Sequence, residues 1–241
     1  MQQTLYGSDL AHVHDVAFGG WARDAAPFVL ARLREAGIEE GRVVDLGCGS
    51  GIWAAALLDA GYEAFGVDAS ADMLAIARER APSAMFAEGS LHDAQLPPCV
   101  AITAIGECVN YGGPPSLEPL FQRASTALEP GGLLVFDAAA PGREPAGRRR
   151  SRHEGDDWVM RVEFAEDRVA RTLTRRIALV RDGRSSEEEH VLRLYEPAEV
   201  VDWLEASGFD VTRHPAYGAG KGLPGVHVYV AVRRARSGDT A

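Results

Sequence analysis

The segment VVDLGCGSG, residues 43–51, passes from a short β-branched run through a glycine-rich turn into an apolar helical pattern. A turn of this kind presents backbone N–H groups and a helix N-terminus to a ligand without side-chain obstruction. In α/β proteins such turns bind nucleotides beyond the carboxyl ends of the strands. The glycines are Gly47, Gly49 and Gly51, and Ile52 stands where the dinucleotide pattern GxGxxG has its last glycine. The segment therefore disfavours a pyrophosphate ligand.

Carboxylates close the two predicted strands that lie nearest this turn. Asp45 ends the first strand, where a carboxylate repels phosphate but holds the ammonium of an amino-acid ligand, directly or through water. Asp68 ends the second, where an acid accepts hydrogen bonds from both ribose hydroxyls of a nucleoside. An ordinary helix-start residue is the alternative for Asp68. Ala69 and Met73 supply apolar contacts for an adenine rim, although Met73 suits a packed core equally well.

Strand-like and helical segments alternate on both sides of the turn. Short apolar runs predict strands, and apolar residues at helical spacing predict the helices between them. The predicted strands are 42–46, 64–67, 84–87, 100–105, 133–137 and 226–232, and the predicted helices are 21–36, 52–60, 70–80, 116–128 and 197–207. This alternation indicates βαβ units around a mostly parallel sheet covered on both faces. Right-handed crossovers make a doubly wound α/β fold the expected architecture.

A different pattern interrupts the alternation between residues 157 and 195. Apolar side chains at 158, 160, 162 and 164 alternate with other residues, and strand-like runs follow at 169–180 and 189–194. We expect three antiparallel strands inserted as an added sheet. Just before them, five arginines crowd the stretch from Arg143 to Arg152. A solvated loop is the simpler interpretation of that cluster, and a clamp for an anionic substrate or a partner surface is the alternative.

Three motifs together resemble the class I S-adenosylmethionine-dependent methyltransferases. They are VDLGCGSG at 44–51, GVDAS at 66–70 followed by Met73 and Leu74, and LEPGG at 128–132. The resemblance covers residues 42–137 well and residues 195–232 in outline. It implies a seven-stranded, Rossmann-like sheet with its last strand antiparallel, carrying an inserted antiparallel β lid. We expect a single domain over 1–241, with a helical cap at 1–41, a cofactor-binding core at 42–140, the lid at 151–195 and a C-terminal part of the core at 196–233.

The resemblance also implies the cofactor S-adenosyl-L-methionine, released as S-adenosyl-L-homocysteine. Asp45, Gly47 and Gly49 would neighbour its methionine part, and Asp68 would take the ribose. The expected cofactor-binding residues are Asp45, Gly47, Cys48, Gly49, Asp68, Ala69, Met73, Ser90, Leu91 and Gly106.

The adenine segment departs from the family pattern. It reads Glu88-Gly89-Ser90-Leu91, and the family often has an aspartate where Ser90 stands. Ser90 can accept a weaker bond from the adenine amino group, and backbone groups of Ser90 and Leu91 can reach the ring. Asp93 is the alternative acceptor.

The segment after the fourth predicted strand reads IGECVNY, residues 105–111. In the family it lies beside the reactive methyl group. The following NYGGPP, residues 110–115, does not match the Asn-Pro-Pro-Tyr type motif of DNA and protein amide methyltransferases. The inserted strands stand where small-molecule methyltransferases carry a lid, and some sugar-amine N-methyltransferases look similar here. A small-molecule substrate is therefore expected.

Hydroxyl and protonated-amine acceptors need a general base near neutral pKa. His14, next to Asp15, and Glu107 are the expected catalytic residues. A surface or helix-capping histidine is the alternative for His14, and a cofactor-binding or loop-orienting carboxylate is the alternative for Glu107. Further histidines are His12, His190, His214 and His227, and tyrosines that can line the pocket are Tyr6, Tyr111 and Tyr217.

The chain has 241 residues and a formal net charge of −10, which lowers the expectation of nucleic-acid binding. It shows no apolar run of the roughly 18 residues that a membrane helix needs, and no secretory signal pattern. Three cysteines without CxxC spacing favour a reducing cytoplasm and no metal site. We expect a monomer or homodimer that methylates an O or N atom of a metabolite. A cofactor-binding sensor or accessory module is the alternative, and an NAD(P)-dependent oxidoreductase is a weaker one.

Overall fold

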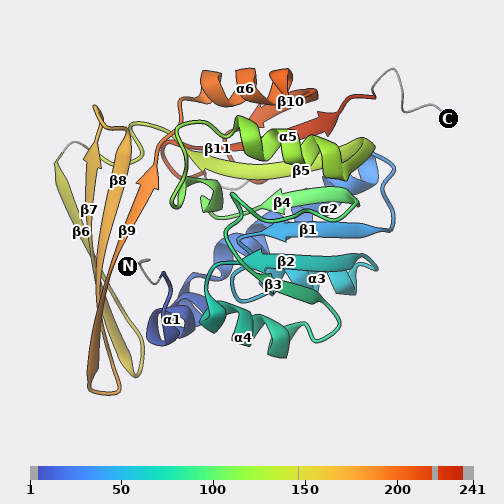
Figure 1. Ribbon diagram of the computed structural model, residues 1–241. Helices are drawn as coiled ribbons and strands as arrows, with labels where there is room; N and C mark the ends of the chain where they lie inside the picture. The colour runs from blue at the N-terminus through green and yellow to red at the C-terminus, as the bar shows by residue number, and fades with distance from the viewer. Residues whose placement is uncertain (1–4, 146, 219–221, 236–241) are drawn as a thin grey trace.

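The computed structural model describes residues 5–145, 147–218 and 222–235, which form two sheets with helices packed around the larger one (Figure 1). The larger sheet has seven strands in the order β10-β11-β5-β4-β1-β2-β3, and the smaller has four in the order β6-β7-β8-β9. The helices are α1 (Ser8–Phe18), α2 (Gly20–Glu35), α3 (Ile52–Asp59), α4 (Ala71–Arg80), α5 (Glu118–Ala127) and α6 (Pro197–Ala206), with a 3-10 turn at Cys108–Asn110. The strands are β1 (Arg42–Leu46), β2 (Glu63–Asp68), β3 (Met85–Glu88), β4 (Cys99–Ala104), β5 (Leu128–Ala139), β6 (Arg148–Glu154), β7 (Trp158–Asp167), β8 (Thr172–Arg181), β9 (Arg184–Arg193), β10 (Phe209–His214) and β11 (Val226–Arg233).

The seven-stranded sheet confirms the predicted class of fold. The interior strand β1 runs parallel to both neighbours, with Val44 opposite Phe65 of β2 and Ile102 of β4. Only β11 runs against the strands beside it, pairing antiparallel with both β5 and β10. Parallel strands meet at one edge with their carboxyl ends, so the turns after β1, β2 and β4 lie close together.

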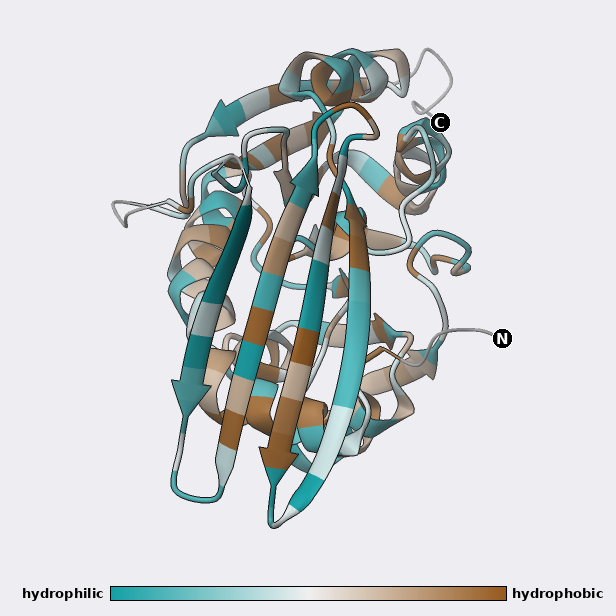
Figure 2. Ribbon diagram, turned by 90° about the vertical axis from the view of Figure 1, so that its left-hand side faces the viewer, coloured by the Kyte–Doolittle hydropathy of each residue, from teal (hydrophilic) through white to brown (hydrophobic). Residues whose placement is uncertain are grey.

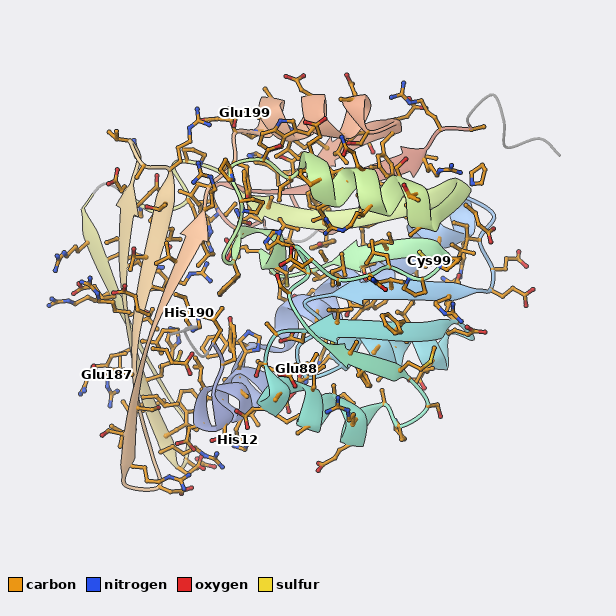
Figure 3. The ribbon with its side chains drawn as sticks, viewed as in Figure 1. His12, Glu88, Cys99, Glu187, His190 and Glu199 are labelled. Atoms are coloured by element: carbon orange, nitrogen blue, oxygen red, sulfur yellow. The ribbon has the colours of Figure 1, made fainter. Side chains whose placement is uncertain are left out.

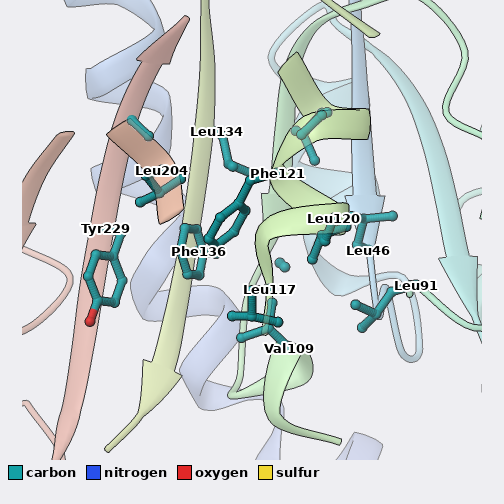
Figure 4. Packing of buried hydrophobic residues seen from close by; sticks show 14 of the residues in the cluster. Leu46, Leu91, Val109, Leu117, Leu120, Phe121, Leu134, Phe136, Leu204 and Tyr229 are labelled. Carbon is teal, nitrogen blue, oxygen red and sulfur yellow. The ribbon is translucent and has the colours of Figure 1, made fainter. Parts of the chain in front are cut away.

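Two apolar clusters fix the sheet between its helices. On one face, α5 and α6 pack Phe121 and Leu204 against Phe136 of β5 (Figure 4). On the other face, α2 and α3 pack Val29 and Trp53 against the strands. Burial of side chains of this size stabilises the fold by roughly 1.5–3 kcal/mol each. The core therefore holds the strand ends, and whatever they carry, in a fixed arrangement.

The four-stranded sheet lies beside the carboxyl ends of the larger sheet and is joined to it between β5 and α6. Its central strands alternate hydrophobic and hydrophilic residues, as Figure 2 shows. The apolar side packs against α1, where Leu10 and Val13 meet Trp158, Met160 and Ile177. We call this four-stranded sheet, β6 to β9, the lid sheet.

The lid sheet has one strand more than the sequence pattern predicts. β6 covers Arg148–Glu154, within the arginine-rich stretch that we interpreted most simply as a loop. It is an edge strand, and its outward arginines pair with acids of β7: Arg148 and Arg150 both contact Glu163. Charged residues on an edge strand oppose pairing with other chains. The sequence does not predict this strand, because a run of arginines shows no alternation of apolar and polar residues.

Three other segments differ from the sequence-based expectations. Residues expected to precede the first helix, including His14, lie within α1. β10 was not assigned from sequence, because its residues are mostly partly or fully exposed and give no apolar run. β5 begins at Leu128, so it includes the Pro130–Gly132 segment that predicts a turn. Among the described residues, no helix is long and apolar enough to cross a membrane.

Candidate active site

A cavity of about 780 Å³ opens between the carboxyl ends of β1, β2 and β4, helix α1 and the lid sheet. Its volume falls within the range of roughly 300–1,000 Å³ that small-molecule sites occupy. Every residue predicted to bind the cofactor or act in catalysis borders it: His14, Asp45, Gly47, Cys48, Gly49, Asp68, Ala69, Met73, Ser90, Leu91, Gly106 and Glu107. The fold thus brings together residues from five separate segments of the chain.

The glycine turn after β1 forms a cradle that side chains would fill. Gly47 and Gly49 have φ angles of 72° and 52°, in the left-handed region that glycine tolerates best. A Cβ on Gly47 would lie 2.6 Å from the Cys108 sulfur, which is too close for any real contact. The N–H groups of Gly47 and Cys48 both donate to the Val67 carbonyl, at 2.7 and 3.0 Å. The turn is therefore held against β2 and leaves its upper surface free for a ligand.

Asp68 joins the glycine turn to the start of α4. Its two carboxylate oxygens accept from the Gly49 N–H at 2.8 Å and the Ser70 N–H at 2.9 Å. Burial raises the pKa of Asp68, and these backbone donors oppose that rise. Each oxygen keeps a further acceptor position. The carboxylate therefore fits a ligand that presents two neighbouring hydroxyls, as ribose does.

Asp45 is buried at the end of β1 and accepts a hydrogen bond from Thr103 at 2.8 Å. Thr103 in turn accepts one from the Trp53 indole at 3.0 Å. Burial raises the pKa of Asp45 to about 7, with the Thr103 bond opposing the rise and the charge of Asp68 adding to it. A cation in the cavity would favour the ionised form. The residue suits the ammonium of an amino-acid ligand.

The adenine end differs in part from the expectation. Ser90 and Leu91 border the cavity, and the Ser90 hydroxyl accepts the His92 N–H at 3.2 Å. Asp93, the alternative acceptor, does not border this cavity and instead borders a separate hollow of about 600 Å³ along β3. Ser90 and Leu91 remain the predicted adenine contacts.

The opposite wall of the cavity carries a network of side chains that reaches into the lid sheet. Arg175 of β8 donates to the Tyr111 hydroxyl at 2.9 Å, and that hydroxyl is 2.9 Å from the hydroxyl of Tyr6. Arg175 also pairs with Glu107, whose other oxygen accepts from Arg143 at 2.7 Å. The network therefore ties the segment after β4 to the lid.

Glu107 sits in an arrangement that does not favour proton acceptance. Burial alone would raise the pKa of its carboxyl, but the guanidinium groups of Arg175 and Arg143 lower it below the usual value. Both carboxylate oxygens are engaged. The geometry agrees better with the alternative that we considered, a carboxylate that orients its surroundings.

His14 faces the cavity from α1, with its ring 5.1 Å from that of Tyr6. Burial lowers the pKa of His14 to about 4, although the charge of Asp15 opposes this. Asp15 itself bonds to Ser50 at 2.6 Å and pairs with Arg80, so its carboxylate serves the helix contact between α1 and α4. Among the described contacts, Asp15 therefore makes no hydrogen bond to His14, although the two residues are adjacent in the sequence.

The remaining candidates divide between the cavity and the core. Tyr6 and Tyr111 border the cavity, whereas Tyr217 is buried and donates to Asp137 at 2.7 Å. His190 is fully buried beside the rings of Tyr6 and Tyr111. His214 packs on Phe28 and does not border the cavity. Among the histidines, cysteines and acids that the structure describes, no group of three or more is arranged to hold a metal ion.

Three residues that organise the site were not anticipated from sequence. Asp137, at the end of β5, accepts from the N–H groups of Gly106 and Glu107 and so fixes the segment after β4. Asn110 bonds to both the N–H and the carbonyl of Ala139, at 2.9 and 3.0 Å. Arg175 lies in β8, and its place in the strand pattern does not mark it as a residue of the site. Only Asp137 carried a signal, since it ends a strand as Asp45 and Asp68 do.

Comparison with known proteins adds independent information about this site. A family model described as a methyltransferase domain matches residues 43–132, which carry the glycine turn, Asp68 and the adenine segment. A dTDP-3-amino-3,6-dideoxy-alpha-D-glucopyranose N,N-dimethyltransferase from Streptomyces fradiae is 26% identical over 236 residues, covering 92% of this chain and 91% of the relative. A trans-aconitate 2-methyltransferase from Paracidovorax citrulli (strain AAC00-1) is 30% identical over 181 residues, covering 69% of this chain and 67% of the relative.

Solved structures share the fold along nearly the whole chain. An S-adenosylmethionine-dependent methyltransferase from Clostridium acetobutylicum ATCC 824 has a TM-score of 0.81 at 20% identity, over 94% of this chain and 98% of that one. The SAM-bound amino pentose methyltransferase CalS10 from Micromonospora echinaspora has a TM-score of 0.74 at 22% identity, over 97% and 100%. At these identities the likeness concerns the fold, and its extent includes the lid sheet.

Proposed function

The chain belongs to the S-adenosylmethionine-dependent methyltransferases, and from that premise we propose that it methylates the nitrogen of an amine on a small molecule, with amino sugars as the favoured class. The enzyme class and its cofactor exclude the sensor and oxidoreductase alternatives as the main activity. When bound, the cofactor supplies a methyl group that a nucleophile can displace from a sulfonium. The acceptor and its atom are the subject of the proposal.

The cofactor half of the cavity supports a defined binding mode. Asp68 would hold the ribose hydroxyls, Asp45 the ammonium, and Ser90 with Leu91 the adenine ring. The space above Gly47 and Gly49 is open, because neither residue has a Cβ. These residues position the donor and need no chemical step of their own.

The observation that supports the acceptor assignment is that the two candidate bases, His14 and Glu107, are poorly suited to accept a proton, since His14 is deeply buried and both oxygens of Glu107 are engaged by arginines. Among the described residues there, burial lowers the pKa of His14 to about 4 and raises that of Tyr6 well above its ordinary value. The two arginines hold the pKa of Glu107 low. An alcohol needs a base to become nucleophilic, whereas a neutral amine already has a free lone pair. The site therefore suits an acceptor that arrives unprotonated.

The Tyr6–Tyr111 pair can orient such an amine. Two hydroxyls that share one hydrogen bond, one of which also accepts from Arg175, retain one donor and two acceptor positions. Neutral His14 adds a further acceptor. An amine that donates its N–H bonds to these atoms points its lone pair away from them. Positioning of this kind, with water excluded, accounts for a large part of the rate in intramolecular reactions.

Carboxylates form a second acceptor class that needs no base. The trans-aconitate relative methylates an acid, by its name, and the partly buried Arg175 borders the cavity, with Arg143 bound to the same carboxylate of Glu107. Glu107 neutralises part of their charge, and the match to the amino-sugar relative covers 92% of the chain. Both points favour the amine.

The test uses labelled S-adenosylmethionine and a matched set of acceptors. The set contains a nucleotide-linked 3-amino sugar, the same sugar with a hydroxyl in place of the amine, a free amino sugar, and a tricarboxylate. We expect label only on amines, with a rate that rises with pH as the acceptor amine loses its proton. Transfer to the hydroxyl analogue, or to the tricarboxylate alone, would refute the assignment.

A further inference from the structure

The N-terminal segment Leu5–Gly7 runs between the lid sheet and the core, and we call it the strap. Leu5 and Tyr6 both border the cavity. The Tyr6 carbonyl accepts from the Ser70 hydroxyl at 2.8 Å, and Ser70 caps α4 by accepting the Met73 N–H at 3.1 Å. The strap is thus joined to the core one residue beyond Ala69 and two beyond Asp68.

On its other side the strap is held by a single carboxylate of the lid. Glu188 of β9 accepts from the Tyr6 N–H at 2.8 Å with one oxygen and from the Gly7 N–H at 2.9 Å with the other. Tyr6 has a φ of 53°, which is unfavourable for a bulky side chain. Successive N–H groups around a left-handed residue form a concavity that suits an anion. The carboxylate of Glu188 therefore stabilises the unfavourable backbone conformation of Tyr6.

His190 holds Glu188 in place. Its Nε2 lies 2.8 Å from the Glu188 oxygen that also receives the Tyr6 N–H, and its ring is fully buried. Since an ionised carboxylate only accepts, Nε2 carries the proton and donates. The ring also packs 4.9 Å from that of Tyr6. In Figure 3, His190 lies on the core side of the lid sheet, and Glu187 lies on the outer side.

From these contacts we propose that Glu188, oriented by His190, is a positioning residue that clamps the strap shut and thereby sets both the exit of the cofactor product and the place of the Tyr6 hydroxyl. Closure over the cofactor does not depend on which acceptor is used, whereas the effect on Tyr6 rests on the proposed function. Since the strap joins the lid to the residue that caps α4, its release opens the cavity beside the ribose-binding acid.

The first test measures how fast S-adenosyl-L-homocysteine leaves the full-length protein. Trp21 and Trp53 border the cavity, so tryptophan fluorescence can follow displacement in a stopped-flow instrument. Glu188→Gln removes the charge and puts an amide in place of one acceptor oxygen, and we expect dissociation to become about tenfold faster. Glu187→Gln, an exposed neighbour on the opposite face, should stay within about twofold of the wild type. Equal rates for the two variants, with unchanged melting temperature, would overturn the clamp.

A second pair of variants keeps Glu188 intact, in case its replacement impairs folding. Gly7 has a φ of −62°, which proline adopts. Gly7→Pro removes one donor to Glu188 and also disfavours the conformation of Tyr6, whereas Gly7→Ala keeps the donor, with its Cβ 3.5 Å from the carboxylate. We expect about fivefold faster dissociation for proline and little change for alanine. Matching rates for the two would contradict the proposal.

A double-mutant cycle tests whether Glu188 acts through Tyr6. On kcat/KM for the amine acceptor, Glu188→Gln and Tyr6→Phe should each cost about tenfold, and the double variant should cost little more than either alone. A product of about 100-fold would show that Glu188 acts elsewhere. If no amine is methylated at all, the proposed function fails while the dissociation rates still decide the clamp.

Discussion

The two walls of the cavity are built by different physical means. The cofactor wall consists of one glycine turn and carboxylates at strand ends, and its hydrogen bonds run to backbone N–H groups of neighbouring segments. The acceptor wall consists of side chains that come from the strap, the segment after β4 and the lid sheet, and its contacts are ion pairs and hydroxyl bonds. The first kind of wall tolerates little change and suits a fixed ligand. The second kind changes with single substitutions, which suits a wall that decides the acceptor.

The largest expected effect lies on the acceptor wall, where the buried Glu107 stands between two partly buried arginines. Glu107→Gln would remove the carboxylate partner of Arg175 and leave Arg143 with only its longer contact to Glu144, at 3.5 Å. We expect a loss of up to about 3–5 kcal/mol in the free energy of unfolding by urea titration. Glu129→Gln, on an exposed acid, serves as the control and should cost less than about 0.5 kcal/mol. A second substitution, Arg175→Gln, should recover part of the loss. Similar stabilities for the Glu107 and Glu129 variants would show that the ion pairs of the acceptor wall do not stabilise the fold as we expect.

The next effect concerns the cofactor wall. Asp68→Ala removes the predicted ribose contact and an acceptor for two backbone N–H groups. With two charge-assisted bonds of about 1.5–3 kcal/mol each at stake, S-adenosylmethionine should bind at least about 100-fold more weakly by isothermal titration. Asp59→Asn, an exposed acid at the end of α3, should bind normally. Unchanged affinity in the Asp68 variant would refute the ribose assignment.

The pH dependence of cofactor binding should isolate Asp45. Burial raises the pKa of Asp45 to about 7, so below that pH the free protein carries a proton that an ammonium ligand must displace. Affinity for S-adenosyl-L-homocysteine should therefore rise about tenfold per pH unit up to pH 7 and then level off. The same shift makes the native state bind the extra proton, so this group lowers stability as pH rises from its unfolded pKa to 7. Asp45→Asn should abolish the pH slope of the affinity and reduce that of the stability, to which the buried Asp68 also contributes. A slope of the affinity that persists in that variant would assign it to another group.

The smallest effect is expected outside both walls, on the outer face of the lid sheet. Arg150 is exposed and pairs with Glu163, as does Arg148. Surface ion pairs of this kind contribute little to stability, because solvent and salt screen the two charges. Arg150→Ala should change neither kcat/KM nor cofactor affinity by more than about twofold. A large loss of activity would revive the anionic-substrate clamp that the arginine-rich stretch suggested.

The residues predicted to bind the cofactor could be expected from sequence to lie together, because the parts of the cofactor wall are local. Gly47, Gly49 and Asp68 stand at fixed places relative to strands that their own apolar neighbours specify. The acceptor wall could not be predicted in the same way. Arg175 lies in an alternating strand that gives no sign of a buried guanidinium, and Tyr6 is 105 residues from the tyrosine whose hydroxyl it contacts. The predicted partnership of His14 with Asp15 followed from adjacency in the chain, but successive residues of a helix point in different directions.

The amino-acid sequence alone determined the sheet, the nucleoside-type turn and the acids that face it, because hydrophobic periodicity and glycine conformation act over a few neighbouring residues. Tertiary structure alone decided which side chains meet across the cavity, and with what protonation. Pairing between Arg175 and Glu107, or between Glu188 and the strap, depends on how two sheets dock. The low pKa of His14 depends on burial that no single segment produces. Burial and the charge of distant neighbours are properties of the packed molecule, so only the tertiary structure decides which polar side chains of the cavity are paired and which are neutral.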